Sequence, residues 1–383
     1  MILELLTAIL YGAIIIGLIY SFINTFITFI EMYKHVPNYK ASSATPAISI
    51  LKPLKGKDDQ LELNLQSFFE LDWPKYEILF GVSDRDDPAI KIVKELQEKY
   101  PHIDTKLIID SSRIGLNPKI NNLHNIYREA KFKYILISDS NVRVKSGYLR
   151  EMMNAMLQPN VGLVTTTFRG TNAKNIGSLL ENLHLNTFVA GNTFTVNKLF
   201  RKPITIGKSM LIKKQIVEKL NGFATFADYL AEDHLLGLYI RKSGMKIFHS
   251  THIIDNVNEN WPLERFINRH LRWAKMRKNL NILHYAVEVL ANPIFIALPY
   301  VIIRGNSIGI MHFIFIALIK SLLDKTIAQI IQSDLKWYHY LLIPFKDIII
   351  GIIWLLPFVD NRVNWRGSVF KIKRGTRLLP VTR

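Results

Sequence analysis

The 383-residue chain contains no cysteine and fewer acidic than basic residues. The absence of cysteine excludes disulfides and cysteine-ligated metal sites, and nothing indicates an oxidising compartment. Asp and Glu number 31 against 49 Lys and Arg, which gives a net charge of +18 at pH 7. Hydrophobic residues make up 49% of the chain, and the mean hydropathy is positive. Together these values indicate concentrated apolar spans with basic residues along a membrane.

The first stretch without charge covers residues 5–30. A run of ~20 apolar residues is long enough to cross the core of a bilayer. A signal peptide is the alternative, but its apolar region has ~7–15 residues and follows a basic segment. Here the first charge is Glu4, so we predict a retained anchor. Because Lys34, His35 and Lys40 follow the run, the positive-inside rule places the next residues in the cytoplasm.

Three further apolar runs lie near the C-terminus, at residues 283–303, 306–323 and 341–359. The first two are plausible membrane spans. The third contains Lys346 and Asp347, and two charges at bilayer depth are costly unless they are paired or near the interface. We therefore interpret it as a re-entrant or tilted segment as readily as a span, and the number of crossings stays open.

Between these apolar ends, residues 46–250 alternate between strand-like and helix-like patterns. Such alternation predicts an α/β domain with a mostly parallel sheet and crossover helices. The predicted strands are 46–54, 76–84, 105–110 and 133–140, and the predicted helices are 61–71, 89–100, 121–131 and 235–244.

Polar residues follow each predicted strand, and ligands of open α/β sheets bind at the carboxyl ends of the strands. These segments are 52–56, 83–88, 113–119 and 139–141. They mix acidic and basic side chains, as a nucleotide with an attached sugar requires. Its diphosphate needs cations, and a metal needs carboxylates.

Each of these residues also has a structural interpretation. Asp84, Asp86 and Asp87 are equally typical of a loop that caps a helix. Lys119 could be an ordinary solvated lysine. Asp139 directly follows a buried strand, a position that favours a metal or phosphate site. The adjacent Glu232 and Asp233 would suit the dipole at a helix start without any catalytic role.

A dense basic cluster begins at RHLRW, residues 269–273. It could bind nucleic acid, a membrane surface or a phosphate leaving group. Nucleic-acid binding would want basic residues interleaved with exposed aromatics, whereas here they are spread over the sheet rim and juxtamembrane segments, so we expect no nucleic-acid partner. On a helix Arg265, Arg269 and Arg272 share one face, and we expect Lys275, Arg277 and Lys278 to face lipid headgroups.

In order along the chain, SILKPLKG, FFELDWPKYEILFGVSDRDDPAI, GLNPKINNL, SDSNVRV, AEDH and RHLRW resemble the motifs of ceramide glucosyltransferases. These are membrane-bound, inverting nucleotide-sugar glycosyltransferases. The similarity covers roughly residues 1–280 and is dense over about 46–145. The segment that begins PFKDIIIG is similar to the tail of bacterial relatives, including hopanoid glycosyltransferases.

This resemblance implies roles for individual residues. Asp87 matches the aspartate that binds the uridine, and Asp84 and Lys119 are expected beside the donor. Asp139 begins a DxD-like metal site for Mg²⁺ or Mn²⁺ whose third position is Asn141, an amide that ligates with less charge. Asp233 matches the catalytic base. The (Q/R)xxRW motif that holds the diphosphate and acceptor is met by Arg269, Arg272 and Trp273.

The resemblance also implies the whole architecture and the reaction. We expect a GT-A-like catalytic domain between N-terminal and C-terminal transmembrane helices, in a multi-pass protein of the bacterial inner membrane with its catalytic domain in the cytoplasm. The expected parts are an anchor at 1–35, the catalytic domain at 46–260, an amphipathic interfacial segment at 261–282, a transmembrane or re-entrant region at 283–359 and a basic cytoplasmic tail at 360–383.

The expected activity is transfer of a hexose from a UDP-sugar to the hydroxyl of a membrane lipid, with inversion. The acceptor stays open among ceramide, diacylglycerol and hopanoid, because the acceptor-side His and Cys of the animal enzymes have no secure counterpart over 184–205. One alternative is a processive polysaccharide synthase, although about three C-terminal spans are few for a channel. Another is a non-enzymatic basic membrane protein that binds anionic lipid.

Overall fold

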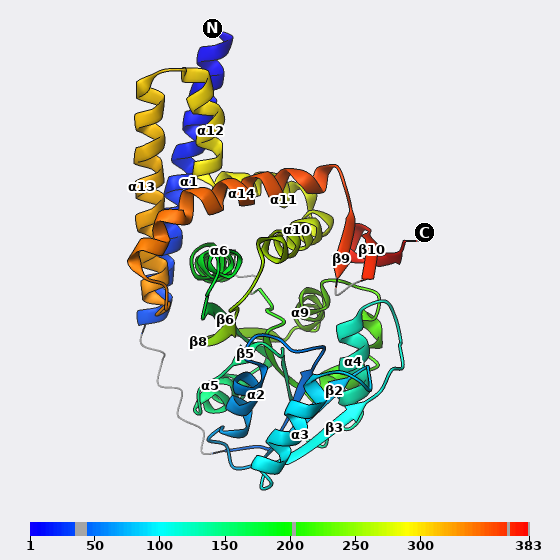
Figure 1. The fold of residues 1–383 in the computed structure, drawn as a ribbon. Coiled ribbons are helices and arrows are strands. Elements are labelled where there is room, and N and C mark those ends of the chain that lie inside the picture. Colours follow the sequence, from blue (N-terminus) through cyan, green and yellow to red (C-terminus); the bar gives the residue numbers. More distant parts are fainter. Residues whose placement is uncertain (35–43, 201–203, 366–367, 382–383) are drawn as a thin grey trace.

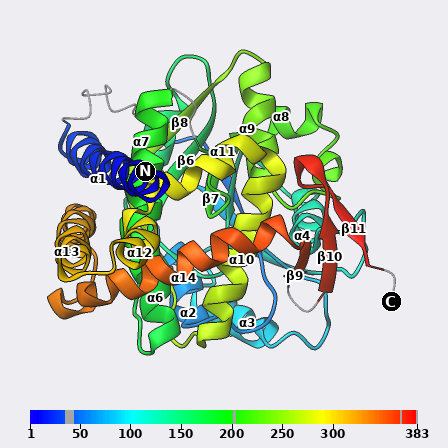
Figure 2. The same cartoon turned by 90° about the horizontal axis from the view of Figure 1, so that it is seen from above.

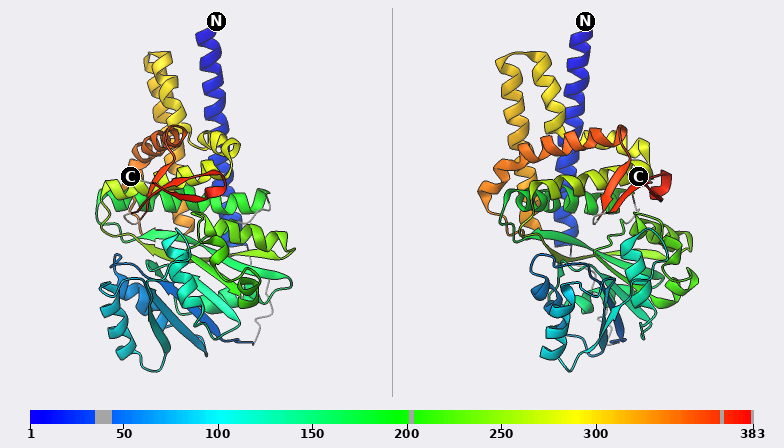
Figure 3. Two further views of the ribbon diagram at one scale, coloured as in Figure 1. Left: turned by 90° about the vertical axis from the view of Figure 1, so that its right-hand side faces the viewer. Right: turned by 45° about the vertical axis from the view of Figure 1, so that its right-hand side comes forward.

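A computed structural model describes residues 1–34, 44–200, 204–365 and 368–381. A bundle of long helices projects from one side of an α/β body (Figures 1 and 3). The predicted anchor is a single helix, α1 (Ile2–Tyr33). His35 and Lys40, used above to orient the chain, lie outside the described residues.

The body is built on an eight-stranded sheet of order β3-β2-β1-β4-β7-β6-β8-β5. The four predicted strands form its parallel half, and β7 pairs antiparallel with both β4 and β6. Every residue of β2 is buried, which explains its continuous apolar run. The strands are β1 (Ile48–Pro53), β2 (Tyr76–Val82), β3 (Asp104–Ile109), β4 (Tyr134–Ser138), β5 (Val142–Arg143), β6 (Val161–Thr171), β7 (Ser209–Lys213) and β8 (Lys246–Val257).

Helices cover both faces of this sheet and enclose two hydrophobic cores. One core contains side chains of α2, α3 and α5, and the other contains side chains of α4, α8 and α9. The four predicted helices are confirmed as α2, α3, α4 and α9; α4 begins three residues earlier than predicted, and α9 begins at Glu232, where the two adjacent carboxylates were expected to start a helix. The bounds are α2 (Leu61–Phe69), α3 (Ala89–Lys99), α4 (Pro118–Tyr127), α5 (Tyr148–Met156), α8 (Lys214–Lys219) and α9 (Glu232–Lys242).

A nearly continuous helical stretch connects the body to the bundle. It consists of α6 (Ile176–His184), a π-helical segment at Leu185–Val189 and α7 (Ala190–Phe200). Beside α6 runs α10 (Leu263–Leu280), which is followed by the short α11 (Ile282–Val287) and a 3₁₀ turn at Glu288–Ala291 (Figure 2).

The bundle consists of α1, α12 (Pro293–Arg304) and α13 (Ser307–Ile330). The predicted span 283–303 is not one straight helix, because the chain bends by 71° between Ile282–Ala291 and Pro293–Arg304. Asn292 caps α12 by accepting a hydrogen bond from Phe295 N at 3.1 Å, and Pro293 occupies the first turn. Three helices of the described residues are long and apolar enough to cross a membrane, or four if the bent pair is one span.

The last long helix, α14 (Ile343–Leu355), runs across the foot of the bundle rather than along it (Figures 1 and 3). The two charged residues of α14, Lys346 and Asp347, form the ion pairs that burial of charge requires. Lys346 lies 2.7 Å from Asp347, and Lys320 of α13 lies 2.5 Å from Asp324 and 3.9 Å from Asp347. These pairs remove the objection to burying Lys346 and Asp347 among apolar helices.

Residues 360–383 were predicted as a basic tail, but most of the described part is a small antiparallel sheet. Its strands are β9 (Arg362–Trp365), β10 (Ser368–Ile372) and β11 (Leu378–Pro380). Leu378 N donates to Asp228 O at 2.7 Å, and Leu230 N donates to Thr376 O at 3.0 Å. The C-terminal sheet therefore clasps the loop that leads directly into α9.

Candidate active site

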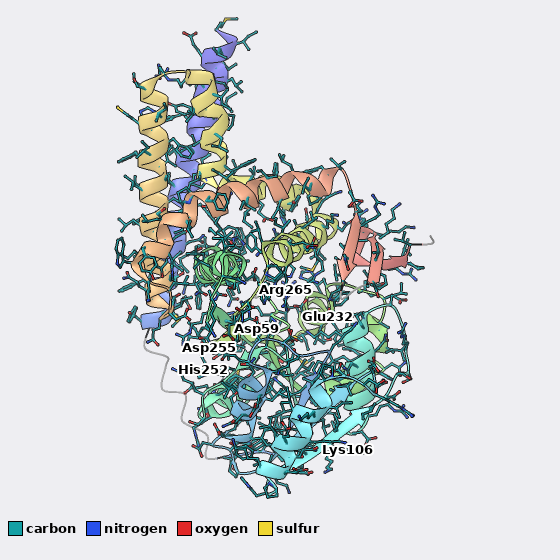
Figure 4. All side chains as sticks on the ribbon, viewed as in Figure 1. Asp59, Lys106, Glu232, His252, Asp255 and Arg265 are labelled. Carbon is teal, nitrogen blue, oxygen red and sulfur yellow. The ribbon has the colours of Figure 1, made fainter. Side chains whose placement is uncertain are left out.

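One cavity of about 1830 Å³ lies between the carboxyl ends of the central strands and α10. It extends along α7 and α11 to Tyr20 on α1, so it joins the sheet rim to the helices of the bundle. All nine residues predicted for the site contribute to its lining: Asp84, Asp87, Lys119, Asp139, Asn141, Asp233, Arg269, Arg272 and Trp273. Figure 4 shows Glu232 and Arg265, which also line it, on α9 and α10 above the sheet.

The loops after β1 and β2 are tied together by Asp87. Its carboxylate accepts hydrogen bonds from Gly56 N at 2.8 and 3.1 Å and from Ala89 N at 2.9 Å. The residue thus closes the turn before α3, as its structural interpretation required, and it also fixes one wall of the cavity. The Asp84 carboxylate accepts a hydrogen bond from Asp86 N at 3.0 Å. Asp84 lines the same wall of the cavity as Asp87.

Lys119 is positioned by the start of α4. The Asn117 side chain caps the helix by accepting from Lys119 N at 2.9 Å and Ile120 N at 3.0 Å, and Pro118 occupies the first turn. The ammonium lies 3.0 Å from Asp139 and 3.3 Å from Glu232. Burial alone would lower the pKa of Lys119, but these carboxylates raise it, so the side chain is charged.

Asp139 is held between two lysines. One carboxylate oxygen lies 3.0 Å from Lys119 Nζ and the other lies 3.1 Å from Lys208 Nζ. Burial would raise the pKa of Asp139, but both ammoniums oppose it and the pKa falls below the usual range. Beneath it, the buried Lys52 donates to the Asp139 backbone carbonyl at 2.7 Å.

The predicted metal ligands do not fit a divalent cation as they are arranged. Lys208 Nζ donates to Asn141 Oδ1 at 2.7 Å while pairing with Asp139, so an ammonium lies between the two side chains. Among the described residues, no group of three His, Cys, Asp or Glu side chains could hold a metal ion. Mg²⁺ or Mn²⁺ at Asp139 and Asn141 stays a prediction that the present arrangement of these side chains does not support.

Asp233 opens α9 next to this cluster. One of its carboxylate oxygens accepts from Gly207 N at 2.9 Å, and the other accepts from His234 N at 2.7 Å. A Cβ on Gly207 would stand 2.9 Å from that carboxylate and 3.2 Å from Lys119 Nζ. A side chain at this position would push the Asp233 carboxylate and the Lys119 ammonium aside, so Gly207 helps to set where Asp233 stands.

Its neighbour Glu232 is more buried and faces Lys119 at 3.3 Å. Burial and the adjacent Asp233 raise the pKa of Glu232, although Lys119 opposes the shift. The two carboxylates therefore have different surroundings on one helix turn.

α10 forms the roof, and its arginines are not equivalent. Arg269 is buried, lies 3.0 Å from Glu181 on α6 and stacks over Trp273 at 4.5 Å. Arg272 lies over the Trp365 ring of β9 at 5.7 Å, and both line the cavity. Trp273 also lines the cavity, and it packs against the hydrophobic core that contains side chains of α2, α3 and α5. The closing motif thus faces the cavity, but Glu181 restrains Arg269.

The expectation that the later basic residues face lipid headgroups is wrong for Lys275, and Arg277 and Lys278 also have partners within the protein. Lys275 is buried and donates to Asp360 at 2.7 Å. Arg277 pairs with Glu288 at 2.8 Å, and Lys278 donates to Pro357 O at 2.6 Å. These side chains attach α10 to the segments that follow α11 and α14, and the buried Lys275 requires such a partner inside the protein.

Sequence reasoning missed Lys208, Gly207 and Glu181, and it missed the C-terminal sheet. The only signal for the first two is the pair Gly-Lys directly before a strand, which is weak by itself. Glu181 had no local signal, since its partners lie 88 and 89 residues further along the chain.

The C-terminal sheet offers a direct test of how the site is held. Leu378 is buried with Leu230 and Phe370, so Leu378→Asp should detach the sheet and release the loop before Asp233. We expect the rate of the expected hexose transfer to fall roughly 10²-fold, the scale of effect that misplaced catalytic groups produce. Proteolytic cleavage near residue 360 together with a transfer assay measures it. Val369→Asp, at a half-exposed position of the same sheet, should change neither, and an equal effect of both substitutions would refute the clasp.

Comparison with known proteins gives concordant matches. The model of the family described as Glycosyl transferase family 21 matches residues 9–378. Ceramide glucosyltransferase 3 of Caenorhabditis elegans is 29% identical over 96% of this chain and 82% of its own length. Ceramide glucosyltransferase of Komagataella phaffii is 24% identical over 85% of this chain and 82% of its own.

Among solved structures, the mannosyltransferase PcManGT from Pyrobaculum calidifontis, in complex with GDP-Man and Mn²⁺, superposes with a TM-score of 0.52. The match covers 92% of this chain and 99% of that one at 15% identity. It confirms the predicted GT-A-like sheet.

Proposed function

We propose that this chain, which belongs to Glycosyl transferase family 21, transfers a hexose from a UDP-sugar to the hydroxyl of a membrane lipid. Family membership makes it a hexosyltransferase; the donor, the acceptor and the stereochemistry are our proposal. One observation supports this proposal most directly. A single cavity joins the carboxylate-and-lysine rim of the sheet to side chains beside the apolar bundle.

The donor end is the sheet rim. Asp87 and Asp84 form the wall where the uridine would bind, and Lys119 brings charge to the rim. In the same cavity Arg269, Arg272 and Trp273 form the roof over the diphosphate. A planar guanidinium suits bidentate contacts with phosphate, which supports Arg272 as the group that stabilises the departing UDP.

Asp233 is the proposed general base. Gly207 N and His234 N hold its two oxygens, so the carboxylate stands ready to accept the proton of the acceptor hydroxyl. The acceptor oxygen attacks the anomeric carbon from the face opposite the diphosphate. The new C–O bond forms as the bond to the phosphate oxygen breaks, and UDP leaves with that electron pair. One displacement inverts the anomeric centre, so an α-linked donor gives a β-glycoside.

The acceptor end supports a lipid. Beyond Asp233 the cavity is lined by Phe188, Val196 and Leu290, and it reaches Ile16 on α1. Apolar side chains beside helices that could cross a membrane suit the chains of a ceramide-like lipid whose hydroxyl reaches the base. The relatives named ceramide glucosyltransferases point the same way.

The apolar helices and the relatives support a membrane location. We propose that the catalytic body lies on the cytoplasmic side, where nucleotide sugars are available, and that the membrane is a bacterial inner membrane. Lys34 directly after α1 agrees with the positive-inside rule.

Mass spectrometry of lipids from a host that expresses the protein tests the proposal. We expect one new species, a lipid heavier by a single hexose, with a β linkage by proton NMR. Asp233→Asn should reduce the amount of this species strongly, by about 10²–10⁴-fold in rate. A ladder of longer sugars would support a processive synthase instead, and the absence of any glycolipid together with no UDP binding would refute the proposed function.

A further inference from the structure

Lys208 lies where the sequence places a metal ion. Its ammonium is 3.1 Å from Asp139 Oδ2 and 2.7 Å from Asn141 Oδ1, the two atoms expected to ligate the cation. The side chain is 15% exposed and lines the same cavity as the donor groups. A positive charge is thus supplied to this position by the chain itself.

The backbone pairing of the sheet, and not only the conformation of the lysine side chain, places Lys208 next to Asp139. β4 and β7 pair antiparallel with Ser138 opposite Ser209, which places Lys208 beside Asp139. Asp139 N donates to Lys208 O at 3.3 Å, which continues this pairing beyond the strands. Gly207 and Lys208 therefore bring the base and the cation to the two sides of one turn.

We propose that Lys208 is the residue that neutralises the donor diphosphate at this position, so that the protein binds its nucleotide without a divalent metal. The inference rests on the proposed function. Asp139 and Asn141 then act as positioning residues that aim the ammonium, and three donor hydrogens allow Lys208 to keep these contacts while it meets a phosphate oxygen. In the transfer step it stabilises the negative charge that collects on the leaving UDP oxygen.

The test is UDP binding by the purified full-length protein, measured by calorimetry in EDTA and again with Mn²⁺. The wild type should bind UDP with affinities within about twofold in the two conditions, whereas Lys208→Met should bind at least about tenfold more weakly in EDTA. Lys208→Arg should retain most of the EDTA affinity because it keeps the charge. Partial recovery of Lys208→Met with Mn²⁺ is expected, since a metal can enter the space that the ammonium leaves.

The outcomes separate the two proposals. If wild-type binding falls tenfold in EDTA, or if Lys208→Met binds like the wild type there, the role of Lys208 is refuted while the proposed function stands. If the wild type binds no UDP in either condition, the proposed function itself fails. An unchanged unfolding midpoint of Lys208→Met, or binding by Lys208→Arg, shows that a loss is not a folding defect.

Discussion

Asp233→Asn should reduce hexose transfer by about 10²–10⁴-fold and leave UDP binding unchanged. The amide has the same size, and its single oxygen can still accept from either Gly207 N or His234 N, so one of the two contacts at the start of α9 is kept. It cannot accept the proton of the acceptor hydroxyl, so only the chemical step is lost. Transfer is measured with a radiolabelled UDP-hexose and ceramide in detergent micelles, and UDP binding by calorimetry.

Glu232→Gln is the matched control on the same helix turn. Glu232 faces Lys119 rather than Gly207, so its substitution should act on the donor and raise the KM for UDP-sugar more than it lowers kcat. If instead Glu232→Gln removes activity and Asp233→Asn retains it, the base is Glu232. That outcome would refute the assignment without affecting the proposed reaction.

The parallel half of the fold could be predicted because its signals are local. Buried strands such as 76–84 end in turn residues, and amphipathic helices follow them within a few residues. The antiparallel half of the sheet is harder to predict, because its strand pairing is not signalled by nearby residues. β7 inserts between β4 and β6, and the approach of Lys208 to Asp139 depends on pairing across about 70 residues, on a register that composition does not specify.

The charge pattern of the sequence indicated where the basic side chains gather, but it did not indicate which groups they pair with. Arg269 and Arg272 of the cluster on α10 line the cavity, and their expected contact with a phosphate stays a prediction. Lys275 and Lys278 were predicted to face lipid because their partners, Asp360 and Pro357 O, lie about 80 residues away in the sequence. The continuous apolar run over 283–303 likewise gave no indication of the bend near residue 292, although Asn-Pro is a typical helix start. The roles of the nine site residues remain predictions that their shared cavity supports.

The largest expected effect on stability comes from Glu181, which no sequence signal singled out. Its carboxylate is fully buried, 3.0 Å from Arg269 and 2.8 Å from His270 Nε2. Burial alone would raise the pKa of Glu181, but Arg269 and His270 lower it, so the group is charged and compensates a buried guanidinium. This pair joins α6 to α10 and thereby ties the roof of the cavity to the helical stretch beside the bundle.

Glu181→Gln should therefore lower the free energy of unfolding by about 3–5 kcal/mol, because removing one partner leaves the Arg269 charge buried and uncompensated. Tryptophan fluorescence during urea unfolding in detergent measures the change. Glu129→Gln is the matched control, since Glu129 forms an ion pair with Lys106 at 2.5 Å in which both side chains are about half exposed, and water replaces the lost contact. Equal stability of the two variants would show that Arg269 finds compensation elsewhere in the cavity, and the roof would then depend on the stacking of Arg269 between Trp261 and Trp273 rather than on charge.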